Sequence, residues 1–92
     1  MLRLNCFFQA KEGRLDDALA AAKELTAASL KQDGCIAYDV FASATRRGVL
    51  LICETWRDDA ALAAHSASDV FARCVAVIND CGDMKIEKFE MG

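Results

Sequence analysis

The side chains best suited to acid–base chemistry lie around one junction of the sequence, ETWRDDAALAAHSASDVF at residues 54–71. This stretch holds the single His and the single Trp of the 92-residue chain, His65 and Trp56. An imidazole titrates near neutral pH, so His65 is the candidate general base or substrate-orienting group. The alternative is a histidine at a helix end that is hydrogen-bonded to backbone or solvent.

Polar side chains within predicted strands are further candidates. Asn5 lies between apolar neighbours, and Glu54 lies in a strand that is predicted to be central. A buried carboxylate or amide needs a partner. For Glu54 we favour a structural ion pair with Arg3 or a dimer contact, with catalysis as the alternative. Tyr38 could reach a substrate oxygen, or it could pack in the core with its hydroxyl in water.

The cysteines are spread along the chain without a CxxC pair, at Cys6, Cys35, Cys53, Cys74 and Cys81. Their odd number argues against a disulfide framework, and one His with dispersed Cys does not supply a zinc site. Free Cys behaves as a small hydrophobic residue, so we expect buried structural thiols and no metal. Cys81, which lies between an Asp and a Gly, is expected to be the most accessible.

Composition and charge exclude several function classes. The chain is 54% hydrophobic and 27% charged, which is typical of a folded domain, and we expect a single domain over residues 1–92. Its net charge of -3 and the scattered Lys and Arg argue against nucleic-acid binding. We expect a cytoplasmic protein without a membrane segment, because the sequence has no signal-peptide pattern and no long apolar run.

Hydrophobic periodicity predicts the elements that must position these side chains. The predicted strands are Leu2–Ala10, Cys35–Ser43, Val49–Trp56 and Met84–Phe89. The predicted helices are Arg14–Lys31, a short helix from Asp58 to His65, and a third helix that Ser68 caps and that runs to Ile78. Gly34 is expected to end the first helix, and the segment 79–83 the last one.

This order predicts a ferredoxin-like βαββαβ subunit of the α+β class, with a four-stranded antiparallel sheet and helices on one face. The first and third strands are central in that topology. Both carry apolar residues at even and at odd positions, and therefore on both faces, such as Phe7 beside Phe8 and Leu50 beside Leu51. No element remains to cover the second face of the sheet. We therefore expect a homodimer joined sheet to sheet.

Several pieces of the sequence together resemble the antibiotic biosynthesis monooxygenase family, over nearly the whole chain. The pieces are Lys11–Gly13, Gly34-Cys35 with Tyr38-Asp39, Glu54-Thr55-Trp56, and Ala61-Leu62 with His65, Ser68 and Phe71. The family consists of small dimeric α+β barrels with a ferredoxin-like subunit. The resemblance implies a cofactor-independent oxygenase that oxidises a small electron-rich aromatic, such as a quinol or a polyketide anthrone, with O2.

In such chemistry the substrate supplies the electrons, so the resemblance implies no flavin, haem or metal. It implies catalytic roles for His65 and Asn5, because relatives often carry His or Asn at the matching places. The candidate substrate-binding residues are Trp56, Tyr38, Phe7 and Phe71. Core packing is the simpler role for each of these aromatics, and also for Phe41.

Two other functions stay open. One is a small-molecule-binding or stress-response dimer without turnover. The other is an isomerase of a phosphorylated autoinducer-type metabolite. The segment 71–76 resembles the matching helix of such isomerases, but they usually have a His where Val70 stands. That function needs cations for the phosphate, and Arg73 is the candidate. Haem degradation is not expected, because haem-degrading relatives have their haem-ligating His where Val75 stands and a Trp in place of His65.

Overall fold

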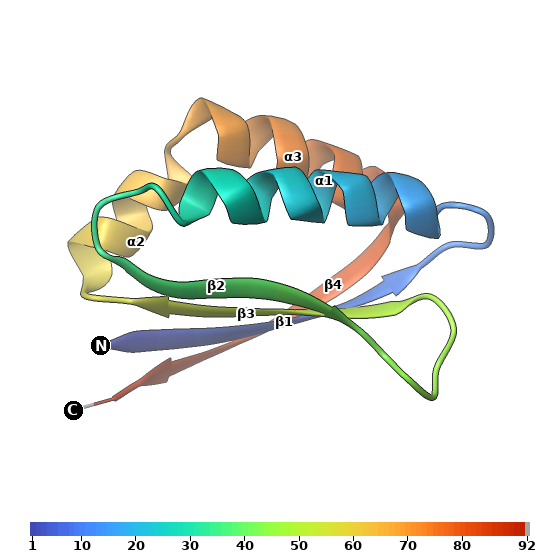
Figure 1. Cartoon of the computed structure of the whole chain (residues 1–92), viewed down its shortest axis with the longest axis horizontal. Helices are drawn as coiled ribbons and strands as arrows, with labels where there is room; N and C mark the ends of the chain where they lie inside the picture. Colours follow the sequence, from blue (N-terminus) through green and yellow to red (C-terminus); the bar gives the residue numbers. More distant parts are fainter. Residues whose placement is uncertain (92) are drawn as a thin grey trace.

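In the computed structural model, which describes residues 1–91, helices cover one face of a four-stranded sheet (Figure 1). The elements are β1 (Leu2–Ala10), α1 (Leu15–Ser29), β2 (Cys35–Ala42), β3 (Val49–Trp56), α2 (Asp59–Ser66), α3 (Asp69–Cys81) and β4 (Gly82–Glu90). The strand order is β2-β3-β1-β4, and every neighbouring pair is antiparallel. The predicted ferredoxin-like α+β fold is confirmed, with β1 and β3 central.

The alternation in β1 sets the two faces of the sheet. Its residues Leu2, Leu4, Cys6 and Phe8 are buried beneath the helices. Full burial of one large apolar side chain contributes about 1.5–3 kcal/mol. α1 and α3 lie side by side over this face, and the shorter α2 lies beside one end of the sheet (Figure 1). The helices and this face of the sheet therefore form the core.

The opposite face of the sheet stays open in one subunit. Phe41, Leu51 and Phe7 lie in one row across β2, β3 and β1, because the register pairs Phe41 with Leu51 and Leu51 with Phe7. Phe41 is 50% exposed and Phe7 is 40% exposed. The expectation that these two residues pack mainly in the core is wrong for a single subunit. We call the face that carries this row the open face.

Two element ends differ from the prediction. α1 ends at Ser29, several residues before Gly34, whose φ of +81° instead serves the turn into β2. α3 continues to Cys81 and β4 begins at once with Gly82, so no loop occupies residues 79–83. Gly82 has an extended backbone, but a Cβ there would collide with the carbonyl oxygen of Gln9. The absence of a side chain at Gly82 therefore allows the start of β4 to lie close to the end of β1.

The cysteines are free thiols. Cys6, Cys74 and Cys81 are buried, and Cys35 and Cys53 are half-buried. The expectation that Cys81 is the most accessible is wrong, because its side chain lies in the core at the end of α3 with no exposed area. Across residues 1–91, no group of three His, Cys, Asp or Glu side chains could hold a metal ion.

Within the same residues no single helix is long and apolar enough to cross a membrane; only α2 and α3 together, bent by 69°, reach the required length and composition.

Candidate functional site

A cavity of about 280 Å³ lies between the helices and the covered face of the sheet. Most of its lining is apolar, with Leu4 and Ile52 from the central strands and Leu25 and Ile78 from α1 and α3. The polar side chains in its wall are Cys6, Tyr38, Glu54, His65, Ser66 and Asn79. No Lys or Arg lines the cavity, so it suits an uncharged ligand better than an anionic one.

α2 brings His65 into the wall of this cavity. The helix begins where the side chain of Asp58 accepts a hydrogen bond from the backbone N–H of Ala61, at 2.9 Å. His65 follows one turn after Ala61 on the same face, and its side chain is buried. Its ring lies against Trp56, with ring centroids 4.4 Å apart, and against Phe71, at 5.0 Å.

β3 supplies a buried carboxylate, Glu54, to the same wall. Trp56 lies two residues further along the strand and therefore on the same face. Its Nε1–H donates to Glu54 Oε1 at 2.9 Å, and the thiol of Cys6 donates to Oε2 at 3.3 Å. Burial raises the pKa of Glu54, while these two hydrogen bonds lower it. Burial also raises the pKa of Cys6, which keeps this thiol protonated.

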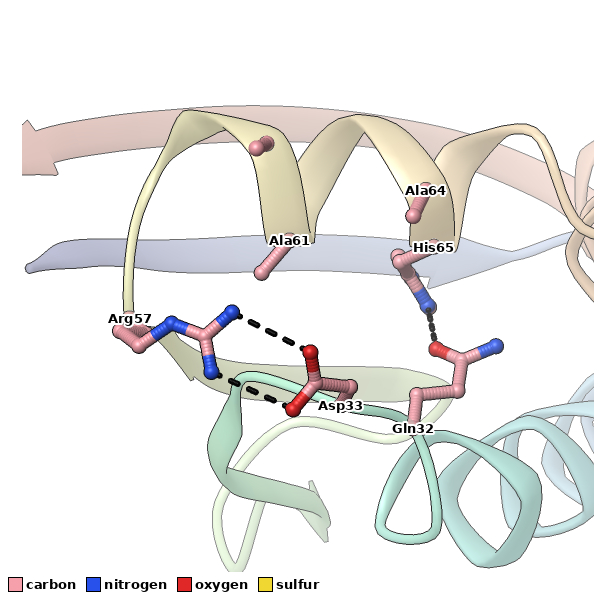
Figure 2. A pocket seen from close by; sticks show the side chains of 7 residues that line it. Gln32, Asp33, Arg57, Ala61, Ala64 and His65 are labelled. Carbon is pink, nitrogen blue, oxygen red and sulfur yellow. Dashed lines mark hydrogen bonds and ion pairs between the residues drawn. The ribbon is translucent and has the colours of Figure 1, made fainter.

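The two ring nitrogens of His65 have different surroundings. Nδ1 lies 2.7 Å from Oε1 of Gln32. A dashed line marks this contact between the two side chains in Figure 2. Because this amide oxygen can only accept a hydrogen bond, the contact favours the tautomer with the proton on Nδ1. Nε2 is then an unprotonated, buried nitrogen without a hydrogen-bond partner, 3.9 Å from Glu54 Oε1. Burial lowers the pKa of His65 to about 4, so the ring is neutral at pH 7.

This arrangement can take a proton from a ligand in the cavity. The lone pair of His65 Nε2 is free to accept a hydrogen bond or a proton. The imidazolium that would form lies beside the Glu54 carboxylate, whose charge would stabilise it. In surroundings as apolar as these walls, that attraction is stronger than it would be in water.

The structure brings together four of the six predicted site residues. Tyr38, His65 and Phe71 line the cavity, and Trp56 lies behind the wall with no exposed area. Asn5 and Phe7 do not join them, because residues of odd number in β1 lie on the open face. Leu4 lies directly opposite Glu54 in the register, and Cys6 is the residue of β1 that donates a hydrogen bond to it.

The structure also corrects the partner assigned to Glu54. Arg3 is exposed on the open face, next to Thr55 in the register, and makes no ion pair with Glu54. Gln32, which the sequence patterns do not single out as a site residue, also contacts His65 from the turn between α1 and β2. Its one distinguishing feature in the sequence is its position in the segment KQDG, beside a predicted glycine turn. A turn position does not indicate a contact with His65.

A second hollow, of about 290 Å³, lies on the outer side of His65. Figure 2 shows its wall, where Arg57 pairs with both carboxylate oxygens of Asp33 at 3.2 and 3.3 Å. His65 is the residue that this outer hollow shares with the cavity. Its ring therefore separates the two spaces.

The candidate phosphate-binding residue lies elsewhere. Arg73 on α3 is largely exposed and forms an ion pair with Glu24 on α1. It does not line the cavity. The site therefore offers no cation of the kind that a phosphorylated substrate needs.

Comparison with known proteins assigns the family. The sequence profile described as "Antibiotic biosynthesis monooxygenase" matches residues 1–77. A solved structure from Bacteroides thetaiotaomicron, described as a conserved protein of unknown function and possible oxidoreductase, is 52% identical. It superposes with a TM-score of 0.95 over 98% of this chain and 96% of that chain.

Two further solved structures have the same fold. One is described as an antibiotic biosynthesis monooxygenase, with 29% identity, a TM-score of 0.91, and coverage of 100% of this chain and 99% of that one. The other, a conserved protein from Methanosarcina mazei, has 25% identity and a TM-score of 0.92, over 99% and 92% of the two chains. No curated protein matches the chain significantly. The profile and the fold together show that this chain belongs to the antibiotic biosynthesis monooxygenase family.

Proposed function

We propose that this protein is a cofactor-independent monooxygenase that oxidises a small, uncharged, electron-rich aromatic of the quinol or anthrone type with O2. The observation that carries the proposal is the unpartnered Nε2 of His65, which lies beside the Glu54 carboxylate in the wall of an apolar cavity. Family membership supports monooxygenase chemistry.

The size and lining of the cavity support this substrate class. Its volume of about 280 Å³ lies just below the usual range for small-molecule sites, roughly 300–1,000 Å³. A ligand of one to three rings suits that space better than a larger one. Phe71 and Tyr38 offer aromatic surfaces for stacking. The substrate's hydroxyl or acidic C–H would point toward His65 Nε2.

In the proposed mechanism His65 acts as the general base. Nε2 takes a proton from the substrate, and Glu54 stabilises the resulting imidazolium. The substrate anion then passes one electron to O2, and the radical pair combines to form a C–O bond. The hydrogen that remains on that carbon leaves as a proton while the O–O bond breaks, and the leaving oxygen departs as water.

The atoms and electrons of this sequence balance. For an anthrone, a CH2 group and O2 become a C=O group and water. For a quinol, the products are a hydroxyquinone and water. O2 takes up four electrons as one atom becomes the new oxygen of the product and the other becomes water, and the substrate provides all four, so the reaction needs no external reductant. The proton that His65 takes up is returned to the departing water.

Oxygen consumption with a panel of anthrones and quinols, with no added cofactor and with a chelator present, tests the proposal. We expect uptake well above the uncatalysed rate, with one atom of ¹⁸O2 in the product. His65→Ala should lower kcat by about 10²–10⁴-fold, as is typical for loss of a general base. Leu30→Ala, at an exposed position on the helical side, is the matched control and should keep full activity.

Two outcomes would contradict the proposal. One is that no compound in the panel consumes O2 faster than without protein. The other is that His65→Ala consumes O2 at the rate of the native protein. Ligands that raise the melting temperature without turnover would instead favour a binding module.

A further inference from the structure

We propose that Gln32, held in place by Ser68, is a positioning residue that fixes the tautomer of His65 and so keeps Nε2 unprotonated toward the cavity. This inference rests on the proposed function, in which Nε2 is the base. Gln32 does not line the cavity and would not touch the substrate. It would act through His65 alone, from the outer hollow (Figure 2).

The hydrogen bonds of Ser68 determine which way the Gln32 amide is turned. The hydroxyl of Ser68 donates to the carbonyl oxygen of His65 at 2.7 Å, and this uses its single proton. The same hydroxyl oxygen can therefore only accept from Gln32, whose Nε2 lies 3.4 Å away. With its NH2 group turned toward Ser68, Gln32 presents Oε1 to the ring of His65.

The amide orientation in turn determines where the imidazole proton lies. A neutral imidazole has one N–H, and two acceptors compete for it. Gln32 Oε1 lies 2.7 Å from Nδ1, within hydrogen-bond distance, whereas Glu54 Oε1 lies 3.9 Å from Nε2 and is too far for one. Gln32 therefore favours the Nδ1–H tautomer. The opposite tautomer would place a proton on Nε2, and His65 could not then act as a base.

A neutral acceptor also suits this position better than a carboxylate. Gln32 fixes the tautomer without adding charge next to the ring. The titratable groups that face His65 are Glu54 from β3 and Tyr38 from β2. On the outer side, Asp33 and Arg57 are paired with each other. A carboxylate in place of Gln32 would also accept from Nδ1, but it would add a charge next to the ring and raise the pKa of His65.

NMR can test this inference without substrate, because His65 is the single histidine of the chain. Long-range ¹H–¹⁵N spectra of ¹⁵N-histidine-labelled native protein should show a protonated Nδ1 and an unprotonated Nε2 at pH 7. In Gln32→Met, which keeps the side-chain length but removes the acceptor, the Nε2–H tautomer should appear. Gln32→Glu should keep Nδ1–H and raise the pKa of His65 by about one unit or more.

Turnover gives a second readout. Gln32→Met should lower kcat by about tenfold or more, because part of the protein carries the wrong tautomer, and leave KM within about twofold. Asp33→Asn, in the same outer hollow but without a bond to His65, is the control and should change neither tautomer nor kcat.

Two results would overturn the inference: a protonated Nε2 in the native protein, or an unchanged tautomer in folded Gln32→Met. The native spectrum alone provides the first test, so the inference stays falsifiable if the variant does not fold. Because the spectra need no substrate, they also separate the two proposals. If no compound consumes O2 but the tautomer depends on Gln32, the proposed function fails alone.

Discussion

The buried pair of Glu54 and His65 is the centre of the proposed chemistry. Burial acts on both side chains in the direction of the neutral form, since it raises the pKa of Glu54 and lowers the pKa of His65 to about 4. Burying a pair of opposite charges costs desolvation free energy, and the attraction between the charges offsets this cost only when they lie close together. In the proposed reaction the imidazolium forms only when the substrate gives up its proton. The stabilisation by Glu54 would then act mainly on the reacting state, which favours catalysis.

The same burial predicts how stability depends on pH. In the unfolded chain His65 takes up a proton near its ordinary pKa of 6.5, whereas in the folded protein it resists protonation down to about pH 4. The unfolded state therefore binds more protons in this window, and stability falls as the pH is lowered through it. The loss from this residue is at most about 3 kcal/mol.

Urea unfolding at about pH 7 and about pH 4.5 measures this effect, with His65→Asn as the comparison. The variant lacks the titrating ring, so the difference in unfolding free energy between native protein and variant should shrink by about 2 kcal/mol at the lower pH. Glu54 titrates in both proteins, so its own contribution largely cancels. A difference that is the same at both pH values would contradict the expectation.

At the scale of elements, the turn between α1 and β2 is central. It places Gln32 beside His65 and brings Gly34 against Ala61 of α2. Gly34 is needed for two reasons: its backbone has a φ of +81°, and a Cβ there would collide with Ala61. This contact fixes how closely the turn packs on the helix that carries His65.

We expect Gly34→Ala to destabilise the protein by about 2–4 kcal/mol, from left-handed strain of about 1–2 kcal/mol plus overpacking against α2. Gly13→Ala is the matched control. Gly13 has a similar φ of +77°, but a Cβ there would meet no atom within 4 Å, so this variant should lose only the strain term. Urea unfolding of both variants, followed by the fluorescence of Trp56, measures the difference. An equal loss of unfolding free energy in both variants would show that the collision with Ala61 does not contribute to the destabilisation.

At the scale of the whole molecule, we propose that the open face is the homodimer interface. The row of Phe41, Leu51 and Phe7 crosses the middle of the sheet and is only partly buried in one subunit. No element among residues 1–91 covers it. A second copy of the chain would remove these side chains from water, at about 25 cal/mol per Å² of apolar surface.

Sedimentation at micromolar concentration tests the dimer. The native protein should sediment as a dimer, and Phe7→Glu with Phe41→Glu should produce a folded monomer, because carboxylates would be buried without partners. Leu30→Glu is the control. Leu30 is 54% exposed just after α1, on the helical side, and its replacement should leave the dimer intact. A native protein that sediments as a stable monomer would refute this interface.

The sequence by itself determined the fold and the kinds of side chain at the site. The strict alternation of β1, the capping residues Asp58 and Ser68, and the order of strands and helices are local signals, because each depends on residues a few positions apart. They predicted the sheet, its central strands and the placement of His65 at a helix end. The same local patterns could not predict that α3 passes into β4 without a loop. The glycine at position 82 is needed because the backbone of Gln9, distant in the sequence, lies against it.

Only the tertiary structure decided which side chains meet. A shift of one position in β1 exchanges the two faces of the sheet, and so Cys6 rather than Asn5 lies beside Glu54. Gln32 is 33 positions before His65 in the sequence and bonds to it because a turn and a helix pack together. No periodicity encodes such a contact. It arises when separate elements pack into one core, and the chemistry proposed here depends on it.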